Sequence, residues 1–330
     1  MTRREFITLL GGAAVAWPLA THGQQTGNVW RIGFLTPRSR PRPAGDDAFS
    51  AAFMRGMSDL GYSEGKNLVV EWRYADGDYS RLTGFASELV GMDLPVIVTY
   101  GTAAARVLQE TTKTTPIVVA AAVDLVGAGI VASLARPGGN ITGLSVIDVD
   151  MSAKQLELLR AFSPKLSRVA VLLNPGNPAN PAVFKHLQAA APALGVEVIA
   201  INAATQQAIE SALAEAAQQG AGAVIVAADA FFSGQGPQIA ASAAQHGLAA
   251  ITLYRDHALA GCLISYGQNV AEFHRQAARY VDRILKGAKP EDLPVEQPTK
   301  LDLVINGKTA ATLGLAIPRE LLVFADEVIE

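Results

Sequence analysis

Short apolar runs alternate with amphipathic segments along almost the whole chain. The runs are rich in Val, Ile, Leu and Ala and end at Gly, Pro or polar residues, which is typical of buried strands. Strands are therefore predicted at residues 30–35, 67–73, 96–98, 116–121, 141–146, 168–173, 196–201, 223–228, 248–253, 262–266 and 301–305.

The segments between these strands repeat apolar residues at helical spacing, as Phe49, Phe53 and Met57 do, and several of them end at a glycine. A short helical region is also expected after the last strand. The main helices are predicted at residues 49–60, 79–90, 103–108, 126–134, 152–162, 182–194, 206–219, 237–246 and 270–286.

Strands that alternate with helices predict the α/β class, with parallel sheets and crossover helices. The chain contains two similar βαβαβ blocks, and it has three places where a strand could change block: Gly143–Ser145, Ser265–Gly267 and Gln297–Lys300. We therefore expect two doubly wound parallel-sheet lobes joined by a hinge of three crossovers. The first lobe would comprise residues 28–143 plus 267–298, and the second residues 144–266 plus 299–330.

The N-terminal 23 residues predict a signal peptide rather than part of the fold. Arg3 and Arg4 precede an apolar run from Ile7 to Leu19, which is well short of the roughly 20 residues that span a membrane. The adjacent arginines followed by Phe6 resemble the twin-arginine export pattern. We expect an exported, periplasmic protein that is cleaved after residue 23, with cleavage after Ala20 as the alternative.

Composition excludes several functional classes. A net charge of −3 with 17% charged residues argues against a nucleic-acid partner, and the single cysteine, Cys262, allows no disulfide within the chain. The phosphate-binding, nucleophile-elbow and zinc-protease motifs are missing, and the five histidines show no metal-ligand spacing. The sequence predicts no enzyme, no cofactor and no metal.

Because ligands of open α/β sheets bind beyond the carboxyl ends of the strands, the residues there form the candidate site. In Pro95–Leu108 a buried strand ends in Tyr100, Gly101 and Thr102, and a helix begins near Ala103. Backbone N–H groups and the helix dipole would both attract an anion at this turn. The turn contains no acid, base or nucleophile, so it predicts binding; a purely structural turn is the alternative.

Further strand ends add hydroxyl groups, carboxylates, amides and aromatic rings to this candidate site. Each has a structural alternative, because Asp is a good helix cap, Asn-Pro-Gly-Asn is a good turn and Tyr packs well in a core. The set suits a small amphipathic ligand that carries a carboxylate and, as a further option, an amine. Its members are Thr36, Asp124, Asn174, Asn177, Asp229, Tyr254 and Tyr266.

Several motifs, spread over the whole chain beyond the signal peptide, resemble the TrpX-like group of ABC transporter substrate-binding proteins. These motifs are SLARPGGNITG (133–143), SYG (265–267), YVDRILKGAKP (280–290), LPVEQPT (293–299), NGKTA (306–310) and ADEVI (325–329). The resemblance implies a type I periplasmic binding protein, whose two lobes close on a ligand that is then passed to a membrane permease.

Characterised members of this group are linked to aromatic amino acids. The resemblance places the ligand-facing turn at Tyr100–Ala103 and the hinge at Ser265–Gly267. Relatives often have Asp-Pro where this chain has Asp124-Leu125, whereas the Asn-Pro element is kept at Asn174. After Asp229 the chain reads Ala-Phe-Phe-Ser instead of the Asp-Asn of tryptophan binders, which argues against tryptophan itself.

The sequence thus predicts a monomeric periplasmic receptor of an ABC importer that clamps a small carboxylate-bearing ligand, aromatic or amino-acid-like. Two alternatives stay open: a ligand sensor for a signalling partner and, less favoured, a secreted α/β enzyme. A sugar-responsive transcription regulator has similar lobes, but it needs a DNA-binding helix-turn-helix in place of the signal peptide, and the sequence has none there.

Overall fold

The computed structural model of the protein describes residues 29–40, 47–147 and 149–330. The predicted signal peptide, residues 1–23, lies outside these ranges. Within the described residues, every helix is too short or too polar to cross a membrane.

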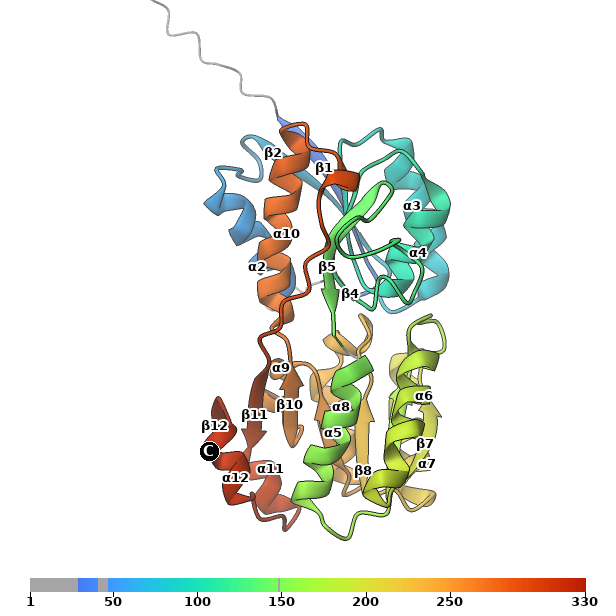
Figure 1. Ribbon diagram of the computed structural model, residues 1–330, viewed down its shortest axis with the longest axis vertical. Coiled ribbons are helices and arrows are strands. Elements are labelled where there is room, and N and C mark those ends of the chain that lie inside the picture. The colour runs from blue at the N-terminus through green and yellow to red at the C-terminus, as the bar shows by residue number, and fades with distance from the viewer. Residues whose placement is uncertain (1–28, 41–46, 148) are drawn as a thin grey trace, which may run out of the picture.

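The first lobe is built on a five-stranded sheet in the order β2-β1-β3-β4-β5, in which all neighbours are parallel. Helices α2 and α10 cover one face, and α3 and α4 cover the other (Figure 1). The strands are β1 (Trp30–Thr36), β2 (Leu68–Tyr74), β3 (Ile97–Tyr100), β4 (Ile117–Val123) and β5 (Ile141–Val146). The helices are α2 (Ala48–Asp59), α3 (Leu82–Gly91), α4 (Thr102–Thr111) and α10 (Val270–Leu285), with 3-10 turns η1 (Tyr79–Arg81) and η4 (Pro290–Asp292).

The second lobe is built on a seven-stranded sheet in the order β12-β11-β10-β9-β8-β6-β7, which is parallel except between β10 and β11. Helices α5 and α6 pack on one face, and α7 and α8 on the other. The strands are β6 (Arg168–Leu173), β7 (Glu197–Asn202), β8 (Ala223–Val226), β9 (Ala249–Thr252), β10 (Ile264–Gly267), β11 (Asp302–Asn306) and β12 (Glu327–Ile329). The helices are α5 (Val149–Phe162), α6 (Asn180–Ala190), α7 (Gln206–Gln218), α8 (Gly236–Gln245), α9 (Arg255–Leu259), α11 (Gly307–Thr312) and α12 (Arg319–Phe324), with η2 (Ala191–Leu194) and η3 (Phe232–Gly234).

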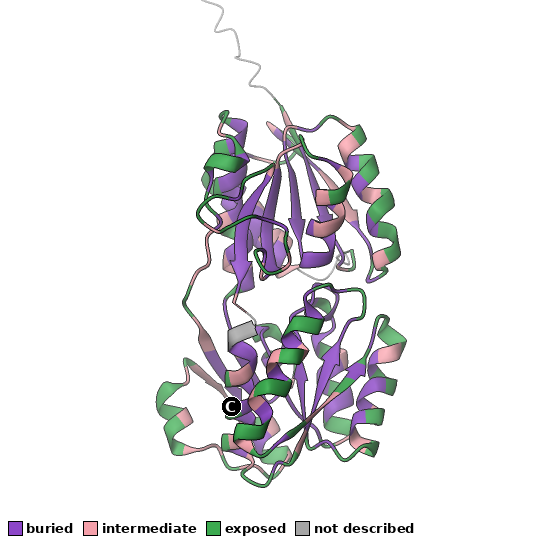
Figure 2. Cartoon of the chain, turned by 45° about the vertical axis from the view of Figure 1, so that its right-hand side comes forward, coloured by how far each residue is buried: buried purple, intermediate pink, exposed green. Residues whose placement is uncertain are grey.

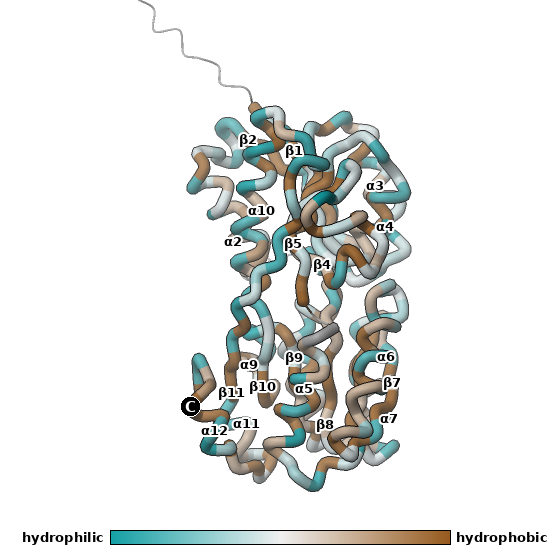
Figure 3. Tube along the Cα trace, viewed as in Figure 1, coloured by the Kyte–Doolittle hydropathy of each residue, from teal (hydrophilic) through white to brown (hydrophobic). Residues whose placement is uncertain are grey.

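Burial on both faces explains why the central strands β3, β4 and β8 are almost entirely apolar rather than alternating between apolar and polar residues. Every residue of β4, Ile-Val-Val-Ala-Ala-Ala-Val, is buried, because helices cover both sides of the sheet. Figures 2 and 3 show the same pattern: buried, apolar strands lie inside, and the helices turn their polar, exposed residues outward. The predicted α/β class with two mostly parallel sheets is confirmed.

The chain passes between the two sheets three times: after β5, between β10 and α10, and ahead of β11. The buried side chain of Gln268 ties these three segments together. Its Oε1 accepts a hydrogen bond from the Ile147 backbone N–H at 2.8 Å, and its Nε2 donates to the Pro298 carbonyl. One amide therefore fixes the crossovers relative to one another.

One predicted helix is wrong. Residues 126–134, expected to be helical, form turns and bends after β4. Gly127 and Gly129 weaken any helix here, and Gly129 adopts a φ of 66°, which ends helical geometry. The carboxylate of Asp124 accepts the Gly127 N–H at 2.8 Å and stabilises this turn instead. The short elements β12 and α9 were not predicted at all.

Candidate ligand-binding site

The two lobes meet where the strands of both sheets end. The hydroxyl of Tyr100, the last residue of β3, lies 3.4 Å from the hydroxyl of Tyr254, which follows β9. The Tyr79 hydroxyl, in the connection after β2, donates to Asp229 Oδ2 at 2.8 Å across the same boundary. Predicted site residues far apart in the chain are therefore neighbours, because parallel strands bring their carboxyl ends to one edge of each sheet.

Asp229 is the centre of this region, and its side chain is almost completely buried. Its carboxylate accepts hydrogen bonds from the side chains of Asn174 (3.1 Å), Asn177 (2.9 Å) and Tyr79, and from the backbone N–H groups of Phe231 (2.9 Å) and Phe232 (3.3 Å). Burial raises the pKa of Asp229, and the hydrogen bonds, led by that from Asn174, offset part of this rise. These five donors fill the acceptor sites of the carboxylate, so a cationic group could bind it only by replacing one of them.

Tyr254 closes the second-lobe side of the site. Its hydroxyl donates to the Asp229 carbonyl at 2.9 Å and accepts from the Asp229 N–H at 3.0 Å, so ring and backbone hold each other in place. Burial raises the pKa of Tyr254 well above its usual value, so the phenol stays protonated. The Tyr254 ring is therefore held in one position, where it lines the two adjoining cavities described below.

The turn at Tyr100–Ala103 has the geometry that the sequence predicts. Gly101 precedes α4 with a φ of 89°, a conformation that favours glycine. The buried Thr102 hydroxyl donates to the Val123 carbonyl at 3.2 Å and accepts its N–H at 3.1 Å, so this hydroxyl fixes β4. The first-turn N–H groups of α4, those of Thr102 and Ala103 included, have no partner within the helix and remain the natural anion donors.

A cavity of about 530 Å³ lies between the lobes and is lined by Tyr79, Asn174 and Phe231 among others. Two smaller, adjoining cavities between the lobes are both lined by Leu253, Tyr254 and Val270. The smaller, about 20 Å³, lies beside Tyr100–Thr102 and Asp229, and has room for about one water molecule. The larger of these two, about 180 Å³, is also lined by Phe49, Ser233, Asp256 and Gln268. At the two adjoining cavities, a small aromatic ligand would need both spaces together, or a modest separation of the lobes, because ligand pockets typically measure about 300 Å³ or more.

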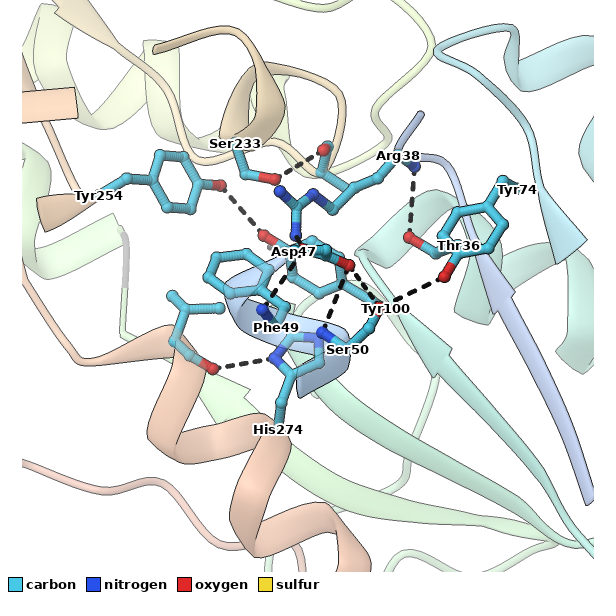
Figure 4. Close-up of polar contacts among 12 residues, drawn as sticks. Thr36, Arg38, Asp47, Phe49, Ser50, Tyr74, Tyr100, Ser233, Tyr254 and His274 are labelled. Carbon is cyan, nitrogen blue, oxygen red and sulfur yellow. Dashed lines mark hydrogen bonds and ion pairs between the residues drawn. The ribbon is translucent and has the colours of Figure 1, made fainter. Parts of the chain in front are cut away.

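Sequence reasoning missed a polar and aromatic group on the first lobe, shown in Figure 4. Arg38 forms an ion pair with Asp47, which also caps α2 by accepting the N–H groups of Phe49 and Ser50, each at 3.3 Å. Burial acts to raise the pKa of Asp47, but Arg38 and Ser50 outweigh it, so that this pKa is lowered. The Tyr74 hydroxyl lies 3.3 Å from Ser50 Oγ. The helix that begins here was predicted at 49–60, and Asp47 just before it is a recognisable cap, but no local pattern indicates its ion pair with Arg38.

Three predicted residues lie elsewhere. The Thr36 hydroxyl accepts the Arg38 N–H at 3.2 Å and holds the backbone after β1. Asp124 is half-buried and engaged in its own turn. Tyr266 is half-buried in β10, whereas its neighbours Ser265 and Gly267 line the cavity of about 180 Å³. The structure does not bring Asp124 or Tyr266 to the two adjoining cavities.

His274 of α10 stacks on Phe49, with ring centroids 4.8 Å apart, and its Nδ1 lies 2.9 Å from the Val270 carbonyl. Burial lowers the pKa of His274 to about 4, whereas an unfolded histidine titrates near 6.5. Its contribution to stability is therefore present above pH 6.5 and is lost as the pH falls toward 4.

We expect wild type to lose roughly 3 kcal/mol more unfolding free energy between pH 7 and pH 4 than His274→Phe does. Urea denaturation at a series of pH values measures this difference. Parallel pH profiles for the two proteins would contradict it. Burial also lowers the pKa of His257 to about 4, but that residue is present in both proteins and cancels in the comparison.

Gly101, before α4, lies directly against the second lobe. A methyl group at this position would lie 2.9 Å from the Ala230 side chain of the second lobe. Gly101→Ala is therefore expected to hold the lobes apart and to weaken ligand affinity by about tenfold or more. Gly139→Ala, where nothing lies within 4 Å of the added methyl, is the matched control and should keep wild-type affinity in calorimetric titration.

Two α/β lobes that meet at their strand ends and are joined by three crossovers have the architecture of a type I periplasmic binding protein. The chain belongs to the ABC transporter substrate-binding protein family, because the profile of that family matches residues 43–329. The resemblance to its TrpX-like group and the type I periplasmic binding protein fold are both confirmed.

Relatives are similar over most of the chain. A tyrosine-binding protein of Clostridioides difficile strain R20291 is 24% identical over 270 residues, which are 82% of this chain and 77% of the relative. The structure of a conserved domain protein of Vibrio cholerae has a TM-score of 0.83 and 28% identity, covering 91% of this chain and 100% of that one. An ABC domain of Streptococcus pneumoniae in complex with L-Trp has a TM-score of 0.80 and 26% identity, covering 90% of this chain and 100% of that one.

Proposed function

We propose that this protein is the exported, periplasmic receptor of an ABC importer, and that it clamps an aromatic amino acid between its two lobes and delivers it to a membrane permease. The observation that carries the proposal is the buried Asp229 carboxylate, which lies between tyrosines of both lobes and opposite the amino-terminal turn of α4. Two relatives named for L-Trp and tyrosine binding support the ligand class.

Each end of such a ligand has a matching group in the site. The ammonium would bind the carboxylate of Asp229, replacing the hydroxyl of Tyr79. The carboxylate would bind the backbone N–H groups at Thr102 and Ala103, where the helix dipole favours an anion. The ring would lie in the cavity of about 180 Å³, against Phe49 and Tyr254.

A thermal-shift screen of amino acids and aromatic carboxylic acids against the purified chain tests this function. We expect a stabilising ligand among L-tyrosine, L-tryptophan and L-phenylalanine, because a ligand at 100 times its dissociation constant stabilises a protein by about 2.7 kcal/mol. Tyr100→Ala and Thr102→Ala should each weaken binding of that ligand. An aromatic hit whose affinity both variants leave unchanged would contradict the proposed site, and the lack of any aromatic hit would contradict the function.

Delivery to a permease is a separate part of the proposal, because a sensor for a signalling partner would bind its ligand in the same way. Uptake of the labelled ligand into cells with and without the gene separates the two. We expect uptake at low ligand concentration to depend on this protein. Unchanged uptake would favour the sensor.

A further inference from the structure

Arg38 places a cationic side chain at the boundary between the lobes. It follows β1, and its backbone is fixed on both sides: its N–H donates to Thr36 Oγ1 at 3.2 Å, and its carbonyl accepts the Asp76 N–H at 3.1 Å. The side chain is only 16% exposed, in contrast to Arg31 at the start of the same strand, which is 54% exposed. The fold therefore fixes a largely desolvated positive charge at the carboxyl end of β1.

The guanidinium lies between groups of both lobes. Its Cζ lies 4.3 Å from the centroid of the Phe49 ring, which lines the cavity of about 180 Å³. On the other side, a methyl group built on Gly234 of the second lobe would lie 3.9 Å from both Nε and Nη2 of Arg38. Figure 4 shows the side chain beside Ser233 and above Tyr100.

Arg38 is also close to the predicted anion turn. Its neighbour Pro37 lies 3.8 Å from the position of a methyl group on Gly101, and the Phe49 ring beneath the guanidinium is 5.5 Å from the Tyr100 ring. A carboxylate at the start of α4 would thus have the helix terminus on one side and a guanidinium nearby on the other.

The hydrogen bonding of Arg38 is incomplete. A guanidinium has five N–H donors, and an ion pair with Asp47 engages Nη1. Within the described part of the chain, Nε is buried and finds no hydrogen-bond partner. Buried donors are nearly always paired, so an unpaired one at the boundary between the lobes indicates a group that binds something else. Nε and Nη2 form one edge of the planar fork that matches a carboxylate.

We propose that Arg38 is the charged receptor for the ligand's carboxylate, acting together with the amino-terminal turn of α4. This inference rests on the proposed function and adds a residue and a selectivity to it. The receptor should discriminate an aromatic amino acid from the corresponding amine, which keeps the ring and ammonium but lacks the carboxylate.

The test combines two changes, one in the protein and one in the ligand. Wild type, Arg38→Gln, Arg38→Lys and the control Arg31→Gln are titrated calorimetrically with L-tyrosine, L-tryptophan, tyramine and tryptamine. In wild type the better amino acid should bind at least about 30-fold more tightly than its amine. Arg38→Gln should weaken binding of the amino acid by at least about 30-fold but change the affinity for the amine by no more than about twofold.

Arg38→Lys keeps the positive charge but loses the planar pair of N–H donors, so it should weaken binding of the amino acid less than Arg38→Gln does. Arg31→Gln should match wild type for all four compounds. If Arg38→Gln weakens amino acid and amine equally, Arg38 only maintains the fold of the site, and the inference is wrong. If Arg38→Gln binds the amino acid as wild type does, the inference alone fails. If wild type binds none of the four compounds and the thermal-shift screen finds no aromatic ligand either, the proposed function fails as well.

Discussion

Asp229→Ala is expected to abolish binding of the aromatic ligand and to lower the free energy of unfolding by about 3 kcal/mol or more. The substitution removes the acceptor for two asparagine amides, one phenol and two backbone N–H groups, all held at the lobe boundary. Each buried donor left without a partner costs about 1–3 kcal/mol. Burial raises the pKa of Asp229, which means that its charged form is costly to bury. Removing that charge offsets part of the loss of stability.

Urea denaturation and calorimetric titration measure the two effects of Asp229→Ala separately. The matched control is Asp59→Ala on the surface of α2, where the carboxylate is 63% exposed and forms a 3.5 Å ion pair with Arg275. That variant should change stability by less than about 1 kcal/mol and keep wild-type affinity. An Asp229→Ala protein with the stability and affinity of the control would refute the role given to Asp229.

Gly143→Ala is expected to destabilise the protein by about 4 kcal/mol or more, or to prevent folding. Gly143 lies in β5 opposite Val119 of β4, with a φ of 132°. A methyl group there would lie 2.1 Å from the Val119 carbonyl oxygen and 2.6 Å from its nitrogen. Because both are backbone atoms of a fully buried strand, no side-chain rotation can relieve the overlap.

Gly84→Ala in α3 is the matched control, since nothing lies within 4 Å of the added methyl. Alanine favours a helix over glycine by up to about 1 kcal/mol, so this variant should be as stable as wild type or slightly more stable. Thermal and urea unfolding of the two variants measure the contrast. A Gly143→Ala protein within about 1 kcal/mol of wild type would show that β4 and β5 do not pair as described.

The fold could be predicted from the sequence because buried parallel strands and amphipathic helices leave strong, regular patterns. The exception, residues 126–134, has apolar residues at compatible spacing, but Gly127 and Gly129 favour turns and Asp124 stabilises one. The spacing of apolar residues indicates which residues are buried, but it does not predict the backbone angles that a glycine adopts.

The candidate site could be predicted only in part. Tyr100 ends β3, and Asp229 and Tyr254 come shortly after the ends of β8 and β9, so the rule for parallel sheets places them together. Arg38 and Tyr79 lie in the connections after β1 and β2. The positions of these residues depend on contacts between the connections, such as the hydrogen bond from the Asp76 N–H to the Arg38 carbonyl. Whether such a residue reaches across to the other lobe depends on how the lobes meet, which local sequence does not encode.

The central claim is that an aromatic amino acid binds between the lobes at the start of α4. A crystal structure of the protein grown with the best ligand of the thermal-shift screen tests it most directly. We expect the ligand's ammonium within hydrogen-bond distance of Asp229, its carboxylate at the N–H groups of Thr102 and Ala103, and its ring between Phe49 and Tyr254. A ligand bound outside the two adjoining cavities, or one that leaves Asp229 bonded to Tyr79, would contradict the account.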